Sequence, residues 1–474
     1  MTFSRIETEI RARMASDGAP PLVVDAFLDS FRRWIDGDLG TIPGSSLGDI
    51  GPLPRLEQLD EFDPAAETAI PHTIVLKLNG GLGTSMGLDR AKSLVVAKNG
   101  LTFLDVVVRQ IQFLRNRCRA PLPLLLMNSF STDADSLAAI AANHPGFANA
   151  AGIPLSFSQH RVPKLDALSR SPVSWPDNPA FEWCPPGHAD VYHALQTTGL
   201  LDSLLANGFR YAFVSNSDNL GALLHMGILA HVARTQVPFL MEVTLRTESD
   251  RKGGHLARDL ASGRLLLRES AQCPPAETDD FQNVRKYSLF NTNNLWINLE
   301  ALRDMLAAAN GLPSLPLIVN RKTVDPSRPD TPPVVQLESA MGSAISCFEN
   351  AGAIVVPRSR FAPVKTTNDL LAIRSDLYAI GPEHQVALHP RRFAPPPDVR
   401  LDPRFFKNLS DFESRFPSGP PSLLQCDSLQ IDGDVFFGAN VRIEGHVHLR
   451  NPTDRPARIA DGSRIHTPLA RPPQ

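Results

Sequence analysis

LKLNGGLGTSMGLDRAKS, residues 76–93, places four glycines directly after an apolar run, residues 73–78, that predicts a β-strand. Glycines at the end of a strand let the backbone approach phosphate oxygens closely. Arg90 and Lys92 close the loop and supply two cations suited to a polyphosphate. We interpret the segment as a phosphate-binding loop of an α/β protein.

Neither standard phosphate-binding pattern fits this loop. The pattern G-x-G-x-x-G begins at Gly81 and requires its third glycine at Met86. The pattern G-x-x-x-x-G-K-[ST] ends correctly at Lys92 and Ser93, but it requires glycines at Met86 and Ala91. A plain strand-to-helix turn with a surface lysine is the rival interpretation, and the density of glycines ahead of Lys92 favours phosphate binding.

Outward from the loop, short apolar runs alternate with helical stretches, as in βαβ units. Helices are predicted over residues 102–117 and 133–143, with a strand over 122–127 between them. Thr102 followed by Asp105 is a capping signal for the first of these helices. The rhythm predicts an α/β core, residues 65–390, around a mixed, mostly parallel sheet.

Two further regions flank this core. Residues 1–64 begin with an apolar stripe at helical spacing and predict a helical N-terminal region. Pro390 and residues 395–397 form a proline cluster that predicts a stiff linker. Beyond it, residues 398–474 carry short apolar runs about six residues apart with glycines between them, a pattern that favours a small β-helix over a sandwich.

Composition excludes several classes of protein. The formal net charge is -3, without the basic stripe of a protein that binds nucleic acid. No apolar stretch is long enough to span a membrane, so we expect no membrane partner. Five cysteines without a C-x-x-C pair argue against both a disulfide framework and a thiolate zinc site. We therefore expect a cytoplasmic protein.

Further candidate sites follow other strands. Asn216 and Asp218 come directly after the strand predicted at residues 211–214, where Asp218 suits Mg²⁺, although an Asx turn is the alternative. His188 lies in a rigid PPGHAD turn, equally interpretable as a substrate contact or a solvent-facing loop. Residues 358–365 concentrate three cations, a second candidate anion site or a charged surface loop. Residues 252–254 and 290–294 could be turns.

Eight segments, together with the β-rich tail at residues 432–445, resemble the eukaryotic-type UTP-glucose-1-phosphate uridylyltransferases, the UDP-glucose pyrophosphorylases, over nearly the whole chain. The segments are KLNGGLGTSMG, LMNSFSTD, PPGHAD, FVSNSDNLGA, KGGHLA, FNTNNLWINL, QLESAMGSAI and PRSRFAPVKTTNDLL. The resemblance implies a Rossmann-like nucleotidyltransferase core and a C-terminal left-handed β-helix. It also implies Mg²⁺-dependent, reversible formation of UDP-glucose and pyrophosphate from UTP and glucose 1-phosphate.

The family pattern also implies a role for each matching residue. Lys92 holds the triphosphate, Lys365 contacts the phosphates at the reacting centre, and Asp218 binds Mg²⁺. The nucleoside lies along Leu78, Asn79, Gly80, Gly81, Met127, Gln159 and Gly187. The sugar and its phosphate lie along His188, Asn216, Gly254, Glu269, Asn291 and Asn293.

The chemistry agrees with this assignment. Joining two anions requires cations at both phosphates and at the leaving pyrophosphate, and Lys92, Lys365 and an ion on Asp218 are three such charges. A sugar phosphate oxygen is already an anionic nucleophile, so the expected in-line attack at the α-phosphorus needs no general base.

Three residues in two segments depart from the family pattern, and several alternatives stay open. Arg90 and Ala91 stand where the family has Gly-Pro, and Ala189 stands where it has Gly. The alternatives are another sugar 1-phosphate as substrate, a nicotinamide-dependent oxidoreductase, and a catalytically silent protein that binds sugar nucleotides. A flat-sided β-helical tail offers a surface for a homo-oligomer, although the oligomeric state is open.

Overall fold

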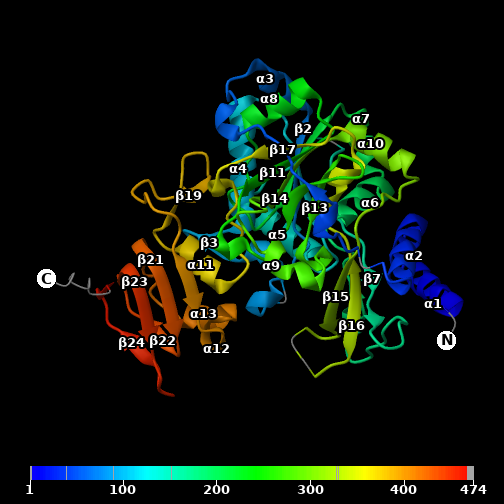
Figure 1. Ribbon diagram of the computed structural model, residues 1–474. Helices are drawn as coiled ribbons and strands as arrows, with labels where there is room; N and C mark the ends of the chain where they lie inside the picture. The colour runs from blue at the N-terminus through cyan, green and yellow to red at the C-terminus, as the bar shows by residue number, and fades with distance from the viewer. Residues whose placement is uncertain are drawn as a thin grey trace.

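The computed structural model describes residues 3–38, 40–88, 90–150, 152–326, 328 and 330–466. Within these residues a ten-stranded sheet forms the centre of the molecule (Figure 1), and its main path runs β1-β12-β14-β10-β2-β5-β6. β11 pairs with β14 and β17, and β13 pairs with β12. The strands are β1 (Leu47–Gly48), β2 (Thr73–Leu78), β5 (Leu124–Asn128), β6 (Ser156–Ser158), β10 (Tyr211–Asn216), β11 (Phe239–Leu245), β12 (His255–Asp259), β13 (Leu265–Arg268), β14 (Leu289–Asn298) and β17 (Gly352–Val355).

The expectation of a mostly parallel sheet is wrong for one half of it. β10, β2, β5 and β6 are parallel to one another, and β11 is parallel to β17. β14, however, runs antiparallel to β10, β11 and β12. The polar residues 291–294 do not predict a strand. They are extended because β14 pairs with its neighbours in the sheet, not because of their own composition. The sheet is therefore mixed.

Helices cover both faces of the sheet because alternate strand residues point to opposite sides. On one face Val75 packs with apolar residues of α4, α5, α8 and α11. On the other face Ile74 and Leu76 pack with α6, α7 and α10. The helices of the core are α3 (Pro64–Ala69), α4 (Phe103–Cys118), α5 (Asp133–Asn143), α6 (Asp190–Thr197), α7 (Leu200–Ala206), α8 (Met226–Thr235), α9 (Thr278–Phe281), α10 (Leu299–Ala308) and α11 (Thr367–Arg374).

The N-terminal helices pack on a satellite sheet. α1 (Phe3–Ser16) and α2 (Pro21–Ile35) bury an apolar stripe that includes Ile10 and Phe31. The stripe packs against Val335 and Leu337 and so docks on the sheet β15-β16-β8. Its strands are β15 (Ile318–Thr323), β16 (Pro333–Glu338) and β8 (Leu165–Asp166), with β7 (Val162–Pro163) and β9 (Trp183–Cys184) paired beside them.

The C-terminal module lies at the opposite side of the central sheet from α1 and α2 in Figure 1. Its strands pair only in parallel among the described residues, in a sheet β20-β21-β23-β25 and a pair β22-β24. The elements are β20 (Asp398–Leu401), α12 (Pro403–Phe406), α13 (Leu409–Arg415), β21 (Ser422–Asp432), β22 (Val435–Phe437), β23 (Arg442–Arg450), β24 (Ala457–Ile459) and β25 (Arg464–His466). Residues 467–474, which the sequence pattern assigns to this C-terminal region, lie outside the described part of the chain.

Two short antiparallel hairpins complete the chain path. β3 (Val96–Lys98) pairs with β4 (Leu101–Thr102), and β18 (Tyr378–Ile380) pairs with β19 (Val386–Leu388). The second hairpin leads toward the predicted proline linker, where Arg392 donates hydrogen bonds to the carbonyls of Leu424 and Cys426. No helix in the described residues is long and apolar enough to cross a membrane.

Candidate active site

The glycine loop leaves the end of β2 and folds back on itself. Leu82 and Ala91 form a bridge across the loop, and the Lys92 N–H donates to the Gly81 carbonyl at 3.2 Å. Ala91, which stands where the related family has proline, is fully buried in this bridge. The loop therefore keeps a closed form and presents Lys92 back toward the strand ends.

The predicted nucleoside residues meet at the carboxyl ends of three parallel strands. Leu78 pairs with Met127 across β2 and β5, and the Gln159 N–H donates to the Asn128 carbonyl at 2.7 Å at the end of β6. The Gln159 amide lies over Gly80, where an added Cβ would approach Nε2 within 2.7 Å. These residues form a wall with an amide donor and acceptor at its surface.

Asn79 belongs to this wall through its backbone. Its side chain is buried and donates to Asn128 Oδ1 at 2.7 Å and to Ser136 Oγ at 2.9 Å. Its N–H donates to the Met127 carbonyl at 2.8 Å. The side chain of Asn79 thus holds β2 to β5 and α5, and a ligand would meet its main chain.

The PPGHAD turn closes one side of this wall. Gly187 has φ +90°, and an added Cβ would lie 2.3 Å from the Ser339 carbonyl oxygen. His188 accepts a hydrogen bond at Nδ1 from the Met341 N–H at 3.0 Å, so its neutral ring carries the proton on Nε2. Burial lowers the pKa of His188 to about 4. The imidazole is therefore a neutral donor at physiological pH.

Asp190, the last residue of the turn, fixes the segment that carries Gln159. Its buried carboxylate accepts from the His160 N–H at 2.6 Å and lies 2.9 Å from His160 Nδ1. The same turn contains Ala189, which is buried and donates its N–H to the Ser339 carbonyl at 3.1 Å. The alanine methyl is accommodated in the core and leaves the shape of the turn intact.

Lys92 and Asp218 come together across the sheet edge although 126 residues separate them. Lys92 Nζ lies 2.6 Å from Asp218 Oδ2, and both side chains are largely buried. The second oxygen, Oδ1, is buried and has no hydrogen-bond partner among the described residues. A cation donor and an unsatisfied carboxylate oxygen therefore lie side by side at the end of β10.

The loop that carries Lys365 is attached to the same strand end. The Val364 N–H donates to the Asp218 carbonyl at 3.3 Å, and the Ala362 N–H donates to Asn219 Oδ1 at 3.0 Å. Asp369 then accepts the Lys365 and Thr366 N–H groups at 2.9 and 2.8 Å and starts α11. Lys365 is thereby held next to Asp218.

The predicted sugar residues form a second wall. An added Cβ at Gly254 would lie 2.6 Å from the Glu269 carboxylate, and the Asn291 N–H donates to the Gly254 carbonyl at 3.2 Å. Asn293 has φ +58° where β14 shifts register against β11, and its Oδ1 accepts from Asn291 Nδ2 at 2.9 Å. The interpretation of residues 290–294 as a turn is wrong, because the segment is part of β14 with a bulge.

Electrostatics connect this second wall to the phosphate side. Burial raises the pKa of Glu269, and the positive charge of Lys365 acts in the opposite direction. Asn216, the last residue of β10, lies beside Leu78 in the parallel register. The nucleoside, phosphate and sugar sets predicted from the sequence are therefore neighbours in the structure.

The interpretation of residues 358–365 as three cations for one anion is wrong for two of them. Arg358 binds Asp250 through both terminal nitrogens at 2.6 and 2.9 Å. Arg360 binds Glu242 in the same two-bond manner at 2.7 and 2.6 Å. Both guanidinium groups are satisfied by protein carboxylates, which spacing along the chain does not reveal.

Two buried charged residues beneath the site, Lys77 and Glu242, were not among the residues predicted from the sequence. Lys77 donates to Ser215 Oγ at 2.7 Å and to the Ala222 carbonyl at 2.9 Å, and burial lowers its pKa to about 7. Glu242 is fully buried in β11. A charged residue in the middle of an apolar strand is the sequence signal that marks such positions, and both residues carry it.

Metal-binding capacity rests on Asp218. The described residues contain no group of three or more His, Cys, Asp or Glu side chains that could hold a metal ion. Mg²⁺ needs no such cage, because it takes one or two carboxylates and completes its shell with phosphate oxygens and water. The unsatisfied Oδ1 of Asp218 fits this mode of binding.

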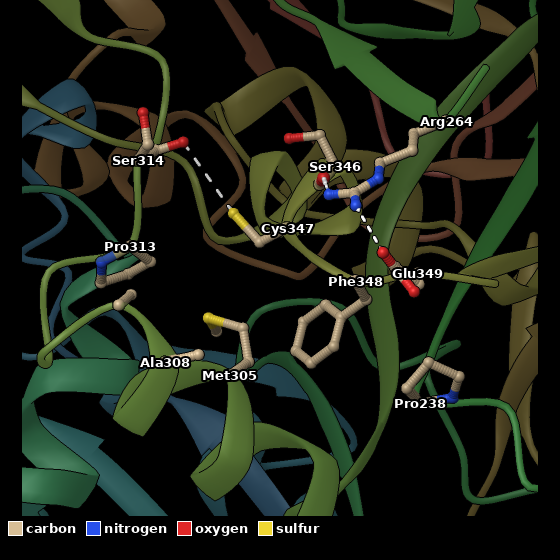
Figure 2. A pocket seen from close by; sticks show the side chains of 11 residues that line it. Pro238, Arg264, Met305, Ala308, Pro313, Ser314, Ser346, Cys347, Phe348 and Glu349 are labelled. Atoms are coloured by element: carbon tan, nitrogen blue, oxygen red, sulfur yellow. Dashed lines mark hydrogen bonds and ion pairs between the residues drawn. The ribbon is translucent and has the colours of Figure 1, made fainter. Parts of the chain in front are cut away.

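A separate cavity lies away from these residues. Figure 2 shows Arg264, Cys347 and Phe348 at its wall, with Arg264 paired to Glu349 at 3.0 Å. Its volume is about 450 Å³. None of the predicted site residues lines it.

Comparisons with known proteins match most of the chain to one family. A family profile described as UTP-glucose-1-phosphate uridylyltransferase matches residues 40–444. The chain is 39% identical to UTP-glucose-1-phosphate uridylyltransferase of Solanum tuberosum over 93% of this chain and 90% of that protein. It is also 39% identical to the Saccharomyces cerevisiae enzyme of that name, over 94% of this chain and 86% of that protein.

Solved structures agree with these relatives. A mutant UDP-glucose pyrophosphorylase from Leishmania major in complex with UDP-glucose superposes with a TM-score of 0.91 at 42% identity, covering 98% of this chain and 99% of that one. UDP-glucose phosphorylase from Trypanosoma brucei superposes with a TM-score of 0.90 at 41% identity, covering 98% of this chain and 100% of that one. The described chain is thus similar in sequence and in fold to the same group of proteins.

Proposed function

The chain belongs to the UTP-glucose-1-phosphate uridylyltransferase family, and from this membership we propose the reaction that its site performs. The protein is a nucleotidyltransferase that makes UDP-glucose and pyrophosphate from UTP and glucose 1-phosphate. One observation supports this proposal most directly: Lys92, Asp218 and the loop that contains Lys365 lie together at one edge of the sheet.

UTP lies along the first wall in this proposal. The base faces Gln159 and the Gly187 turn, because an amide beside Gly80 offers both a donor and an acceptor to a uracil ring. The triphosphate follows the glycine loop toward Lys92. Glucose 1-phosphate occupies the second wall, with Asn291 and Glu269 as polar contacts and the neutral His188 as a hydrogen-bond donor.

Charge compensation is the main catalytic contribution of the chain. Attack of the sugar phosphate oxygen on the α-phosphorus brings two anions together and expels pyrophosphate on the opposite side. Lys92 and Lys365 supply positive charge to the phosphates, and such preorganised charges stabilise the transition state without reorganisation. No general base is needed, because the attacking oxygen carries no proton that must be removed.

We propose that Asp218 holds Mg²⁺ through Oδ1, which is the unsatisfied oxygen of its carboxylate. When bound, the ion neutralises phosphate charge and fixes the geometry of the phosphate chain. Lys92 Nζ contacts Oδ2 of the same carboxylate at 2.6 Å and leaves Oδ1 available to a cation. The residues present fit this cofactor.

We also propose the finer features of the architecture that the resemblance implies. Residues 65–390 act as the catalytic unit between the regions 1–64 and 398–474. Parallel pairing of β20, β21, β23 and β25 supports a left-handed β-helix in the last region. A homo-oligomer through this region, and a cytoplasmic site of action consistent with five unpaired cysteines, complete the proposal.

One assay tests the reaction and its substrate together. The purified protein is incubated with UTP, Mg²⁺ and a panel of sugar 1-phosphates that includes galactose and N-acetylglucosamine, while pyrophosphate release is followed and the nucleotide sugar is identified by mass. We expect UDP-glucose, and we expect EDTA to stop its formation. Binding of UTP without pyrophosphate release from any sugar would support a silent binding protein instead.

A further inference from the structure

Arg360 is buried beneath the phosphate side of the site and makes three charged or polar contacts there. Its Nε donates to Glu242 Oε2 at 2.7 Å and its Nη2 donates to Glu242 Oε1 at 2.6 Å. The same Nη2 donates to the Leu223 carbonyl at 2.7 Å. Arg360 is 6% exposed and Glu242 is 0% exposed, so the ion pair is shielded from solvent.

Glu242 is saturated by donors from the neighbouring strand. Trp296 Nε1 donates to Oε1 at 2.9 Å, and Asn294 Nδ2 donates to Oε2 at 3.1 Å. Burial by itself raises the pKa of Glu242. The charge and hydrogen bonds of Arg360, together with the hydrogen bonds of Trp296 and Asn294, outweigh this effect and lower the pKa overall. The carboxylate is therefore ionised and fixes the guanidinium in one orientation.

The main chain at Arg360 is tied to the strand end that carries Asp218. The Arg360 carbonyl accepts from Asn219 Nδ2 at 3.1 Å, and Asn219 Oδ1 accepts from the Ala362 N–H at 3.0 Å. An added Cβ at Gly221 would lie 2.2 Å from the Ser359 carbonyl, so the two loops are in close contact. Four residues beyond Arg360, the Val364 N–H donates to the Asp218 carbonyl at 3.3 Å.

We propose that the buried Arg360–Glu242 pair is a positioning device that holds the Lys365 loop against Asp218. The proposal rests on the proposed function, because it assigns the pair to the alignment of two groups of that site. Arg360 and Glu242 touch no substrate in this arrangement and act only through the placement of Lys365 relative to Asp218. The device fixes the distance between the Lys365 charge and the metal-binding carboxylate.

Energetics favour positioning over a purely stabilising role. Removing two charges from water costs free energy that their attraction seldom exceeds, so apolar residues of similar volume serve a core at least as well. A planar, two-bond contact instead fixes orientation. Because catalysis is sensitive to displacements of about 1 Å, a rigid pair directly beneath the reacting groups has a function that an apolar pair lacks.

Substitutions that keep volume and fold test the device. Arg360→Lys keeps the charge and loses the two-bond geometry, and Glu242→Gln keeps the shape and loses the charge. Each variant is also made together with Lys365→Ala. Arg415→Lys is the matched control, since Arg415 forms a part-buried pair with Asp434 at 2.8 Å in the C-terminal module. The measurements are kcat, KM for UTP, calorimetric UTP affinity and melting temperature.

Arg360→Lys and Glu242→Gln should each lower kcat by about 10- to 100-fold while UTP affinity changes by less than about threefold. In the Lys365→Ala background the further loss in kcat should be less than about threefold, because the pair acts through Lys365. Arg415→Lys should leave kcat unchanged. A merely structural pair would lower kcat by the same factor in both backgrounds.

Three outcomes overturn the positioning role. The first is a kcat within about threefold of wild type in folded Arg360→Lys protein, and the second is full additivity with Lys365→Ala. The third is failure of both single variants to fold, which would make the pair a stability element. Failure of the proposed function is separate, because wild-type protein would then release no pyrophosphate in the same assay.

Discussion

Lys365 lies beside Asp218, where we propose that its positive charge stabilises the reacting phosphates. Its loop is bonded to the Asp218 carbonyl through Val364, and its charge acts on the buried carboxyl of Glu269. Removing one preorganised donor that stabilises transition-state charge lowers kcat by about 10²- to 10³-fold, and we apply the same scale to Lys365. We expect this loss for Lys365→Ala, measured by pyrophosphate release at saturating UTP and glucose 1-phosphate.

The control for this prediction is Lys407→Ala, which removes an exposed lysine in the C-terminal module. Circular dichroism should show that both variants are folded. A Lys365→Ala protein with kcat within about threefold of wild type would remove Lys365 from the catalytic residues.

Gly187 meets two separate restrictions. Its φ of +90° is a backbone conformation that residues other than glycine adopt only with strain. In addition, an added Cβ would lie 2.3 Å from the Ser339 carbonyl oxygen. We expect Gly187→Ala to lower the free energy of unfolding by more than about 2 kcal/mol, because strain and a backbone clash add. Displacement of the adjacent His188 should also lower kcat/KM for glucose 1-phosphate.

Gly199→Ala separates the two causes, since Gly199 has φ +68° but no atom within 4 Å of an added Cβ. This variant should lose only about 1 kcal/mol, the cost of a left-handed backbone alone. Urea unfolding of both proteins gives the comparison. Equal losses in the two variants would mean that the Ser339 contact is easily relieved.

Helix α4 shows how a local signal defines an element. Thr102 Oγ1 accepts from the Asp105 N–H at 3.0 Å, and Asp105 accepts from the Thr102 N–H at 2.9 Å, which confirms the predicted cap. Thr102→Ala should therefore lower the free energy of unfolding by about 1 kcal/mol without changing kcat. Thr8→Ala, on the exposed surface of α1, is the control and should change stability by less than about 0.5 kcal/mol.

Elements with local signals are those that the sequence predicts well. The predicted strand at 73–78 coincides with β2, and the predicted helix at 133–143 coincides with α5. β14 is different, because its polar half at 291–294 is extended only through pairing with β11. Propensity and periodicity describe a residue and its near neighbours, and they contain no information on which distant strand will pair with it.

In the candidate site too, some features are predictable from the sequence and others are not. Lys92 and Asp218 are each marked by their place after an apolar strand, but their 2.6 Å contact joins residues 126 positions apart. The partners of Arg358 and Arg360 lie on other elements, so the sequence left these arginines as unassigned cations. Residue types at a strand end are readable from the sequence, whereas charge pairing is decided by the tertiary fold.

The core and the C-terminal module share one apolar interior. Leu370 and Leu371 of α11 belong to the same buried cluster as Phe406, Leu423 and Phe437. The Lys365 loop leads directly into α11, so the module is attached to the side of the catalytic loop. A continuous interior of this kind should unfold cooperatively, so a mutation that destabilises the module should also lower the stability of the core.

Buried histidine makes the stability of this interior depend on pH. His255 is 0% exposed, stacks on Tyr287 at 3.9 Å and packs against Phe281 at 5.0 Å. Burial is the main cause that lowers its pKa to about 3. The hydrogen bond to the Leu256 carbonyl opposes this effect, Arg246 and Arg268 add to it, and Asp280 acts against it.

The sign of the dependence follows from proton uptake. The unfolded chain protonates His255 near its ordinary pKa of 6.5, while the folded protein keeps the ring neutral until about pH 3. The unfolded state thus binds more protons in this window, so stability is full above about pH 6.5 and falls as pH drops toward 3. At pH 4 the loss from this one group is about 3 kcal/mol.

Replacement of His255 by Phe should therefore flatten the decline of stability between pH 6.5 and pH 4. The absolute stability of the variant is secondary, because a larger ring beside Tyr287 also changes packing, and the slope is the quantity that reports the titration. His188, whose pKa is about 4, contributes in the same direction and leaves a residual slope. His466→Phe, at an exposed position of β25, is the matched control and should keep the wild-type slope. Urea unfolding at half-unit pH intervals measures all three proteins, and an unchanged slope in His255→Phe would place the acid-sensitive group elsewhere.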